Sequence, residues 1–186
     1  EWKKEFNAVK DLLSEIEGFD FESFDINNQE HIEKIKKIIK ALYSSEMLSS
    51  VTDVILKNEV IIEVEKAIND ELGLEGEDQI TINPDNIPST SDAWNKEIDI
   101  IYQIVTDFQN IGEFNFTDEE TINKIKSVID NLYKSDLFKD VANKTLKKVV
   151  VNEIESGINS ALELETPIEI SEELVPTTSD AWNKEI

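Results

Sequence analysis

The sequence predicts an all-α (mainly) protein of two tandem repeats, each a small three- to four-helix bundle followed by a short extended connector that contains proline. Three observations support this prediction. A nine-residue stretch, Thr90–Ile98, recurs unchanged as Thr178–Ile186. Apolar residues recur at spacings of three and four through most of each half, the pattern of amphipathic helices. All four prolines fall in two short segments that lack this pattern.

The two halves can be aligned over nearly their whole length. Matched residues are 92 positions apart in the first helix, 90 apart from Phe24 onward and 88 apart in the nine-residue stretch. The differences fall where loops are expected, because connections tolerate changes of length better than helices do. We therefore expect one repeat over residues 1–90, a second over 91–178 and the start of a third over 179–186. Since the sequence starts and stops inside this pattern, we expect it to be a fragment of a longer array.

The first helix of each repeat is expected over residues 2–17 and 91–110, where apolar residues form one stripe. Ser91 or Thr90 suits the N-cap of the later helix, and Asp92 would lie in its first turn, where the helix dipole favours an acid.

The loops that follow these helices contain glycine and then aromatic residues. Gly18 and Gly112 suit a left-handed C-cap. Phe21 and Phe116 are the candidate ligand-contact aromatics, because an exposed aromatic cluster is a typical binding surface. The interpretation that we favour is that these rings close the end of the helical bundle.

Capping boxes mark the second helix of each repeat, with Asn27 and Thr117 as the expected N-caps. A third helical stretch covers about residues 46–72 and 136–162. We expect a short helix followed by a longer one, with a single bent helix as the alternative. The β-branched runs inside these stretches are also compatible with strands, but an apolar spacing of four favours helix. These runs are Val60–Ile62 and Val149–Val151.

Each repeat ends in a segment of a different kind. Ile80–Ile82 and Ile168–Ile170 alternate apolar and polar residues, which predicts extended backbone. The prolines of these segments make a connector stiffer than a Gly/Ser linker. They are Pro84, Pro88, Pro167 and Pro176.

The composition excludes several classes of function. The net charge is −23 and the chain contains no arginine, so nucleic acid is a poor partner. Without cysteine, the chain forms no disulfide and has no thiol nucleophile. No apolar run approaches the roughly 20 residues of a membrane span, so we expect no membrane insertion in this fragment.

No catalytic or cofactor-binding constellation is apparent, and we predict that the protein is not an enzyme. His31 is the one histidine, its counterpart is Thr121, and we expect it to face solvent. We predict no cofactor and no metal ligands. Calcium is the alternative that we weighed, because Asp20, Glu22 and Asp25 alternate as acids do in calcium loops, although the glycine and final glutamate of an EF-hand are missing.

We interpret the recurrent stretch as a joint between repeats. It follows a proline, supplies a helix cap and carries a tryptophan that would fill a pocket on the preceding repeat; the competing interpretation packs each tryptophan within its own bundle. The predicted joint residues are Pro88, Ser91, Asp92 and Trp94, then Pro176, Ser179, Asp180 and Trp182.

We therefore expect a non-catalytic tandem-repeat module of a large acidic protein on the surface of a bacterium, acting as a stalk, spacer or adhesive array. Its expected partners are neighbouring repeats of the same chain. One alternative is a module that binds a protein or glycan ligand through the aromatic loops. The other is an intracellular scaffold or filament subunit, so a cytoplasmic location stays open.

Overall fold

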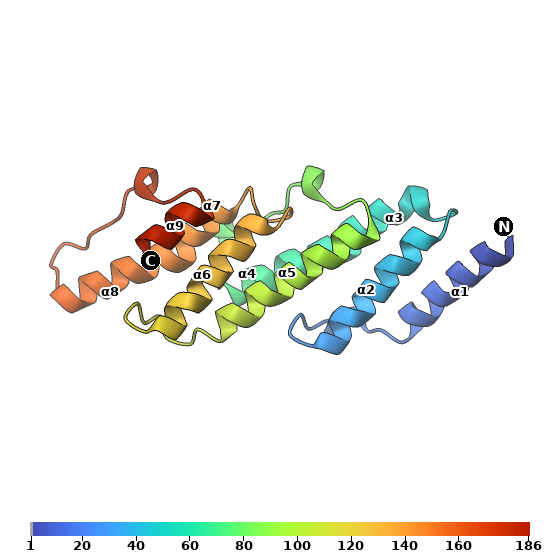
Figure 1. Ribbon diagram of the computed structural model, residues 1–186, viewed down its shortest axis with the longest axis horizontal. Coiled ribbons are helices and arrows are strands. Elements are labelled where there is room, and N and C mark those ends of the chain that lie inside the picture. The colour runs from blue at the N-terminus through green and yellow to red at the C-terminus, as the bar shows by residue number, and fades with distance from the viewer. Residues whose placement is uncertain (1) are drawn as a thin grey trace.

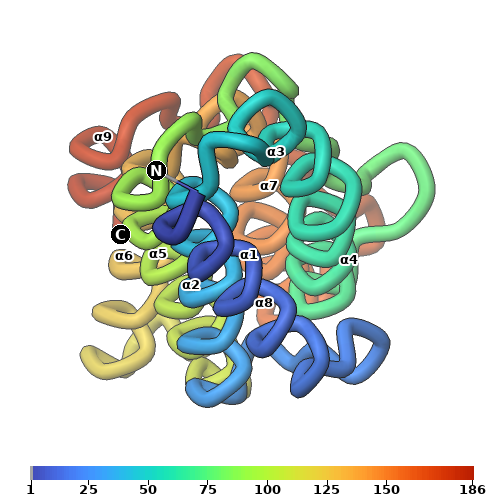
Figure 2. The backbone as a smooth tube through the Cα atoms, turned by 90° about the vertical axis from the view of Figure 1, so that its right-hand side faces the viewer, coloured from blue at the N-terminus to red at the C-terminus, as the bar shows by residue number. Residues whose placement is uncertain are grey.

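The computed structural model describes residues 2–186, which fold into helices and connecting loops without a strand. The molecule is elongated, and its helices lie in two layers (Figures 1 and 2). One layer contains α1 (Trp2–Glu17), α2 (Gln29–Ser44), α5 (Ser91–Gln109), α6 (Glu119–Lys134) and α9 (Ser179–Glu185). The other contains α3 (Ser49–Leu56), α4 (Ile62–Glu71), α7 (Ala142–Leu146) and α8 (Asn152–Leu162). This confirms the all-α fold class.

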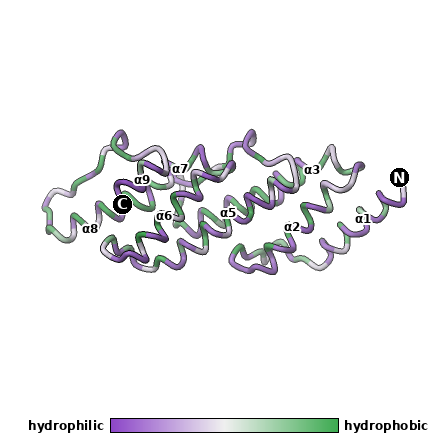
Figure 3. The backbone as a smooth tube through the Cα atoms, in the orientation of Figure 1, coloured by the Kyte–Doolittle hydropathy of each residue, from purple (hydrophilic) through white to green (hydrophobic). Residues whose placement is uncertain are grey.

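The helices of the first layer follow one another along the long axis. Helix α1 packs on α2, α2 on α5, α5 on α6 and α6 on α9. Hydrophobic and hydrophilic residues alternate along each helix at the spacing expected of a helix with one buried side (Figure 3). The buried side chains form one hydrophobic cluster that includes Leu12 near one end and Trp182 near the other. The core is therefore continuous through both halves of the chain, and α5 lies in its middle.

The helix starts differ slightly from the sequence prediction. Asn28 and Asp118 are the N-caps, in place of the expected Asn27 and Thr117: Asn28 Oδ1 accepts from the Glu30 amide at 2.9 Å, and Asp118 Oδ2 from the Thr121 amide at 2.8 Å. The amides of Asn27 and Thr117 instead donate to side chains two residues earlier, at 2.9 and 3.0 Å. Such a local turn competes with the capping position.

The third helical stretch of each half begins later than predicted, at Ser49 and Ala142, because residues 46–48 and 136–141 form turns. From there each stretch is helical, which excludes the strand alternative. Helix α3 passes through a π-helical turn, Lys57–Ile61, directly into α4, and α7 passes through Lys147–Val151 into α8. The predicted break near Lys57 is therefore a local widening of one continuous helix. The β-branched runs fall largely in these turns, where Val60, Ile61 and Val149–Val151 are buried.

Of the two predicted glycine caps, one is present and the other is not. Gly112 adopts φ +65°, as expected after a helix end. Gly18 has no positive φ, so that prediction was wrong. The chain leaves α1 by a tight turn in which the Phe19 amide donates to the Ile16 carbonyl at 3.0 Å.

The connectors are extended and held to the preceding helices by side chains. Asn69 donates to the Ile80 carbonyl at 3.0 Å and accepts from the Ile80 amide at 2.7 Å. Asn159 makes the same pair of bonds to Ile168, at 3.2 and 2.8 Å. Each connector therefore returns along its own helix before the next helix begins. None of the helices described is long and apolar enough to cross a membrane.

Candidate functional site

Trp94, near the start of α5, is the most completely enclosed large side chain at the contact between α5 and α2. Its relative exposure is 0%. Its indole N–H donates to the Tyr43 hydroxyl, at the end of α2, at 3.2 Å. That hydroxyl lies 3.2 Å from the Pro88 carbonyl and 3.1 Å from Asp53 Oδ1, so its single proton serves one of these acceptors at a time. Trp94 thus connects the end of α2, the connector and α5.

Trp182 has the same surroundings at the start of α9. It is 2% exposed, and its indole N–H donates to the Tyr133 hydroxyl at 3.2 Å. The Tyr133 hydroxyl lies 3.4 Å from the Pro176 carbonyl and also bonds Asn143. The same tryptophan–tyrosine–proline arrangement therefore occurs twice.

Burial reinforces the neutral form of the tyrosines in both arrangements. It raises the pKa of Tyr43 to about 12; the hydrogen bond from Trp94 acts in the opposite direction and nearby Asp53 adds to the rise. Burial likewise raises the pKa of Tyr133. The hydroxyls stay protonated and uncharged at neutral pH, so they serve as hydrogen-bonding groups and not as bases.

The remaining predicted joint residues lie around the helix starts. The N-cap is Thr90 and not Ser91: Thr90 Oγ1 accepts from the Ala93 amide at 3.2 Å. Thr178 caps α9 in the same way, leaving Ser179 to bond Asp130 on α6. Asp92 and Asp180 are exposed in the first turns, where the helix dipole favours an acid. Pro88 is buried, whereas Pro176 is half-buried.

Two glutamates that the sequence analysis did not single out also join helices. Glu97 on α5 is 1% exposed and accepts from the Ser135 hydroxyl at 2.7 Å and the Asp136 amide at 3.0 Å. Glu5 on α1 accepts from Ser45 and from the Glu46 amide, and these bonds hold its pKa below the usual range. The shared Trp-x-x-Glu spacing was the available signal for this pair.

The aromatic loops lie against the core. Phe21 and Phe116 are half-buried and pack on the hydrophobic cluster. Phe21 meets Phe19 edge to face at a centroid distance of 4.8 Å, and Phe116 lies 6.0 Å from Phe114. His31 was expected to face solvent but is half-buried beside Phe19, where its Nδ1 accepts from the Asp25 amide at 3.1 Å.

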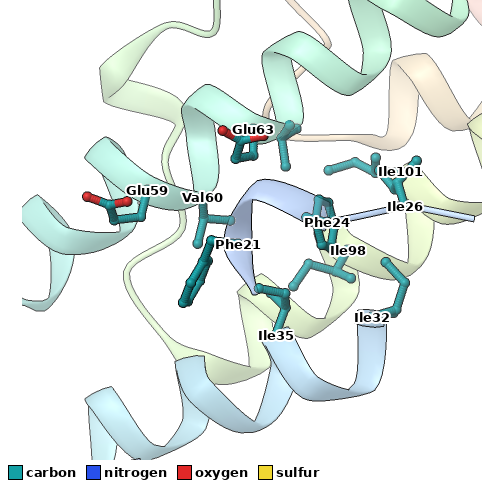
Figure 4. A pocket seen from close by; sticks show the side chains of 11 residues that line it. Phe21, Phe24, Ile26, Ile32, Ile35, Glu59, Val60, Glu63, Ile98 and Ile101 are labelled. Carbon is teal, nitrogen blue, oxygen red and sulfur yellow. The ribbon is translucent and has the colours of Figure 1, made fainter. Parts of the chain in front are cut away.

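A small apolar pocket lies between Phe21, α2, α5 and the π-helical turn (Figure 4). Ile32, Ile35, Ile98 and Ile101 line it, and Glu59 and Glu63 lie at its edge. Its free volume is about 20 Å³. Ligand pockets usually enclose roughly 300–1,000 Å³, so this space is too small for an organic ligand, and its apolar lining does not suit a water molecule either.

The aspartates of the acidic loop after α1 accept hydrogen bonds from nearby backbone amides. Asp20 Oδ1 accepts from the Glu22 amide at 3.1 Å and Asp25 Oδ1 from the Asn27 amide at 2.9 Å. Within residues 2–186, no group of three or more His, Cys, Asp or Glu side chains is placed to hold a metal ion.

Comparisons of the chain with protein-family profiles, with curated proteins and with solved structures gave no match.

Proposed function

We propose that the chain is a non-catalytic structural segment in which tandem helical repeats stack end to end as a stiff stalk or spacer. The observation that carries the proposal is the tryptophan–tyrosine contact, made by Trp94 with Tyr43 and again by Trp182 with Tyr133 at the same 3.2 Å. In each case the tryptophan begins a proposed repeat and the tyrosine belongs to the repeat before it. The contact therefore acts between repeats.

The packing of α5 supports a stiff joint. Helix α5 contacts α2 of the preceding repeat and α6 of its own, so the core is not interrupted at the boundary. A linker between independent domains would leave few contacts across it. A shared helix between two cores resists bending because bending would open close-packed apolar surface.

Polar contacts between the two halves of the chain add direction to the joint. Asn86 in the first connector donates to Asp140 at 2.8 Å, and Lys148 pairs with Asp78 at 3.0 Å. Lys36 on α2 pairs with Asp99 on α5. Partly exposed ion pairs contribute little free energy, on the order of 0–1 kcal/mol each, but they select one orientation.

A distance measurement between spin labels would test the proposal. The chain has no cysteine, so Lys40→Cys on α2 and Ser160→Cys on α8 provide two unique labelling sites, both exposed. Pulsed electron paramagnetic resonance should give one narrow distance distribution. Trp94→Ala should broaden it, whereas the control Trp182→Ala should not, because Trp182 lies beyond the labelled joint. A broad distribution in the parent chain would refute a stiff spacer.

We also propose that the array is displayed on the surface of a bacterium. A strongly acidic surface without cysteine suits a long, soluble stalk. Antibodies against the chain should label intact cells of the source organism. Labelling only after permeabilisation would instead support the intracellular scaffold. The alternative of a ligand-binding module draws less support, because the aromatic loops pack on the core and leave about 20 Å³ free.

A further inference from the structure

The loop between α5 and α6 contains the tripeptide Asn115-Phe116-Thr117. Asparagine followed two residues later by serine or threonine, with any residue but proline between them, is the acceptor sequence for a glycan on the asparagine amide. Asn115 and Thr117 are exposed, whereas Phe116 packs on the hydrophobic cluster. The fold therefore anchors this loop by its aromatic ring and presents the acceptor sequence to solvent.

The hydrogen bonds of Asn115 determine which atom of its side-chain amide points away from the loop. Its Oδ1 accepts from the Thr117 amide at 3.0 Å and from the Thr117 hydroxyl at 2.7 Å. Because a backbone amide can only donate, the oxygen must lie on this side and Nδ2 on the other. Within residues 2–186, Nδ2 makes no hydrogen bond. This nitrogen can therefore take a substituent without loss of a contact in the fold.

The matching loop of the first half shows how little of this chemistry the turn itself requires. Asp25 occupies the position of Asn115, and its Oδ1 accepts from the Asn27 amide at 2.9 Å. Aspartate and asparagine both make such a turn through one side-chain oxygen. The first half thus forms the turn without the amide nitrogen of Asn115 and without the hydroxyl of Thr117. These two groups, which define the acceptor sequence, are additional to what the turn needs.

A second sequence of the same type, Asn143-Lys144-Thr145, lies in a different environment. It belongs to α7, where Thr145 is 1% exposed and its hydroxyl donates to the Val141 carbonyl at 2.9 Å. The Asn143 side chain bonds the Tyr133 hydroxyl. An enzyme cannot reach this threonine while the helix is folded. The two sequences therefore differ in accessibility and not in type, which makes Asn143 a matched control.

The position of the loop is compatible with a large group on Asn115. The loop lies at the edge of the molecule opposite the proline-containing connectors (Figure 1). The joint residues Trp94, Tyr43 and Pro88 lie at the start of α5, the end of α2 and the end of the connector, away from this edge. An attached glycan, which is bulky and hydrated, would project into solvent and leave the stacking of the helices unobstructed.

We propose that Asn115 is the attachment site of an N-linked glycan. The proposal rests on the display at the cell surface proposed above. A bond forms between Asn115 Nδ2 and the anomeric carbon of a sugar, and the bond from that carbon to the diphosphate of a lipid-linked glycosyl donor breaks. The diphosphate leaves with the bonding electrons, and the amide nitrogen loses one proton to a base of the transferase. The chain supplies the acceptor, and a separate transferase supplies the activation.

Mass spectrometry of the protein purified from its source organism would test the proposal. The reference is the same chain produced in a host cytoplasm that contains no such transferase. The natural protein should be heavier by the mass of a glycan, and peptide mapping should place this increment on Asn115. Asn115→Asp and Thr117→Val, produced in the source organism, should each lose the increment completely. Thr117→Ser and Asn143→Asp should both retain it.

The Asn115→Asp variant also separates loss of the acceptor from loss of folding. It reproduces Asp25 of the first half and keeps the oxygen that accepts from the backbone amide. Its circular dichroism spectrum and thermal midpoint should therefore equal those of the unmodified parent chain. An unmodified Asn115 in the natural protein would overturn the proposal, as would an increment that persists in Asn115→Asp. Antibody labelling of intact cells is a separate measurement, so a displayed protein with an unmodified Asn115 would overturn this proposal alone.

Discussion

Trp94→Ala should destabilise the protein far more than Trp182→Ala, although both side chains are almost fully buried. A fully buried tryptophan replaced by alanine loses about 3–5 kcal/mol. Trp94 should show this whole loss, because α5 is held between α2 and α6 and cannot leave without opening the core. The protein's total stability is expected to be about 5–15 kcal/mol, so the effect is large.

Trp182 belongs to a helix of seven residues whose main partner in its layer is α6. Ordering seven backbone residues costs roughly 7 kcal/mol at about 1 kcal/mol each. Burying about 200 Å² of tryptophan returns about 5 kcal/mol, and the Thr178 cap about 1 kcal/mol. Helix hydrogen bonds then leave α9 docked by only about 1 kcal/mol. Trp182→Ala cannot lower the free energy of unfolding by more than this docking free energy. Once α9 has undocked, the missing tryptophan side chain has no further effect.

Guanidinium unfolding followed by far-UV circular dichroism would measure both variants. We expect a loss of about 3–5 kcal/mol for Trp94→Ala and of at most about 1 kcal/mol for Trp182→Ala. Equal losses, or a loss below about 1 kcal/mol for Trp94→Ala, would refute the argument that α5 joins the two halves through one core.

Three further predictions use matched residues of the two halves. Asn69→Ala should lower the free energy of unfolding by about 2–3 kcal/mol because it leaves a buried backbone amide and carbonyl unpaired, whereas the more exposed Asn159→Ala should cost about 1 kcal/mol; equal losses in urea unfolding would contradict this. Gly73 has φ +63° and Glu163, its counterpart, has φ +48°. Gly73→Ala should therefore lower the free energy of unfolding by about 1 kcal/mol, and Glu163→Gly should raise it by a similar amount. Thermal midpoints that shift in the same direction in both variants would disprove the strain. The Ile170 amide and Lys147 hold the pKa of Glu155 below its usual range, so its contribution to stability is full above about pH 4.5 and is lost as the pH falls; Glu155→Gln should flatten this part of a pH–stability curve, and an unchanged slope would contradict the assignment.

The helices could be predicted from the sequence because their signal is local. The apolar spacing of α2 and α6 and the break at the proline segments placed most boundaries within a few residues. The caps were displaced by one residue at Asn28 and Asp118, because the preceding residue in each case makes a competing turn that no spacing reveals. The π-helical turns were missed because the β-branched runs over them, Val60–Ile62 and Val149–Val151, are apolar at every position and hide a shift of one residue in the apolar stripe.

The contacts between helices could not be predicted in the same way. Trp94 was expected either to contact the preceding repeat or to pack within its own bundle, and nothing in the sequence pointed to Tyr43 as its partner, because the two are 51 residues apart. Glu97 had no predicted role, since a glutamate on an amphipathic helix is normally exposed. Its burial depends on the turn at Ser135, which only the folded chain brings near.

The repeated nine-residue stretch resembles a binding motif because its two copies are identical, but contacts within the fold account for three of its positions. Thr90 supplies the helix cap at 3.2 Å, Trp94 donates its indole N–H at 3.2 Å, and Glu97 accepts two bonds at 2.7 and 3.0 Å. A change at any of these positions leaves a polar group of the joint without its partner, at a cost of about 1–3 kcal/mol. Exchanges among Ile, Val and Leu in the surrounding helices usually cost less than about 1.5 kcal/mol. A stretch that forms the joint is therefore restricted in sequence even when it binds no ligand.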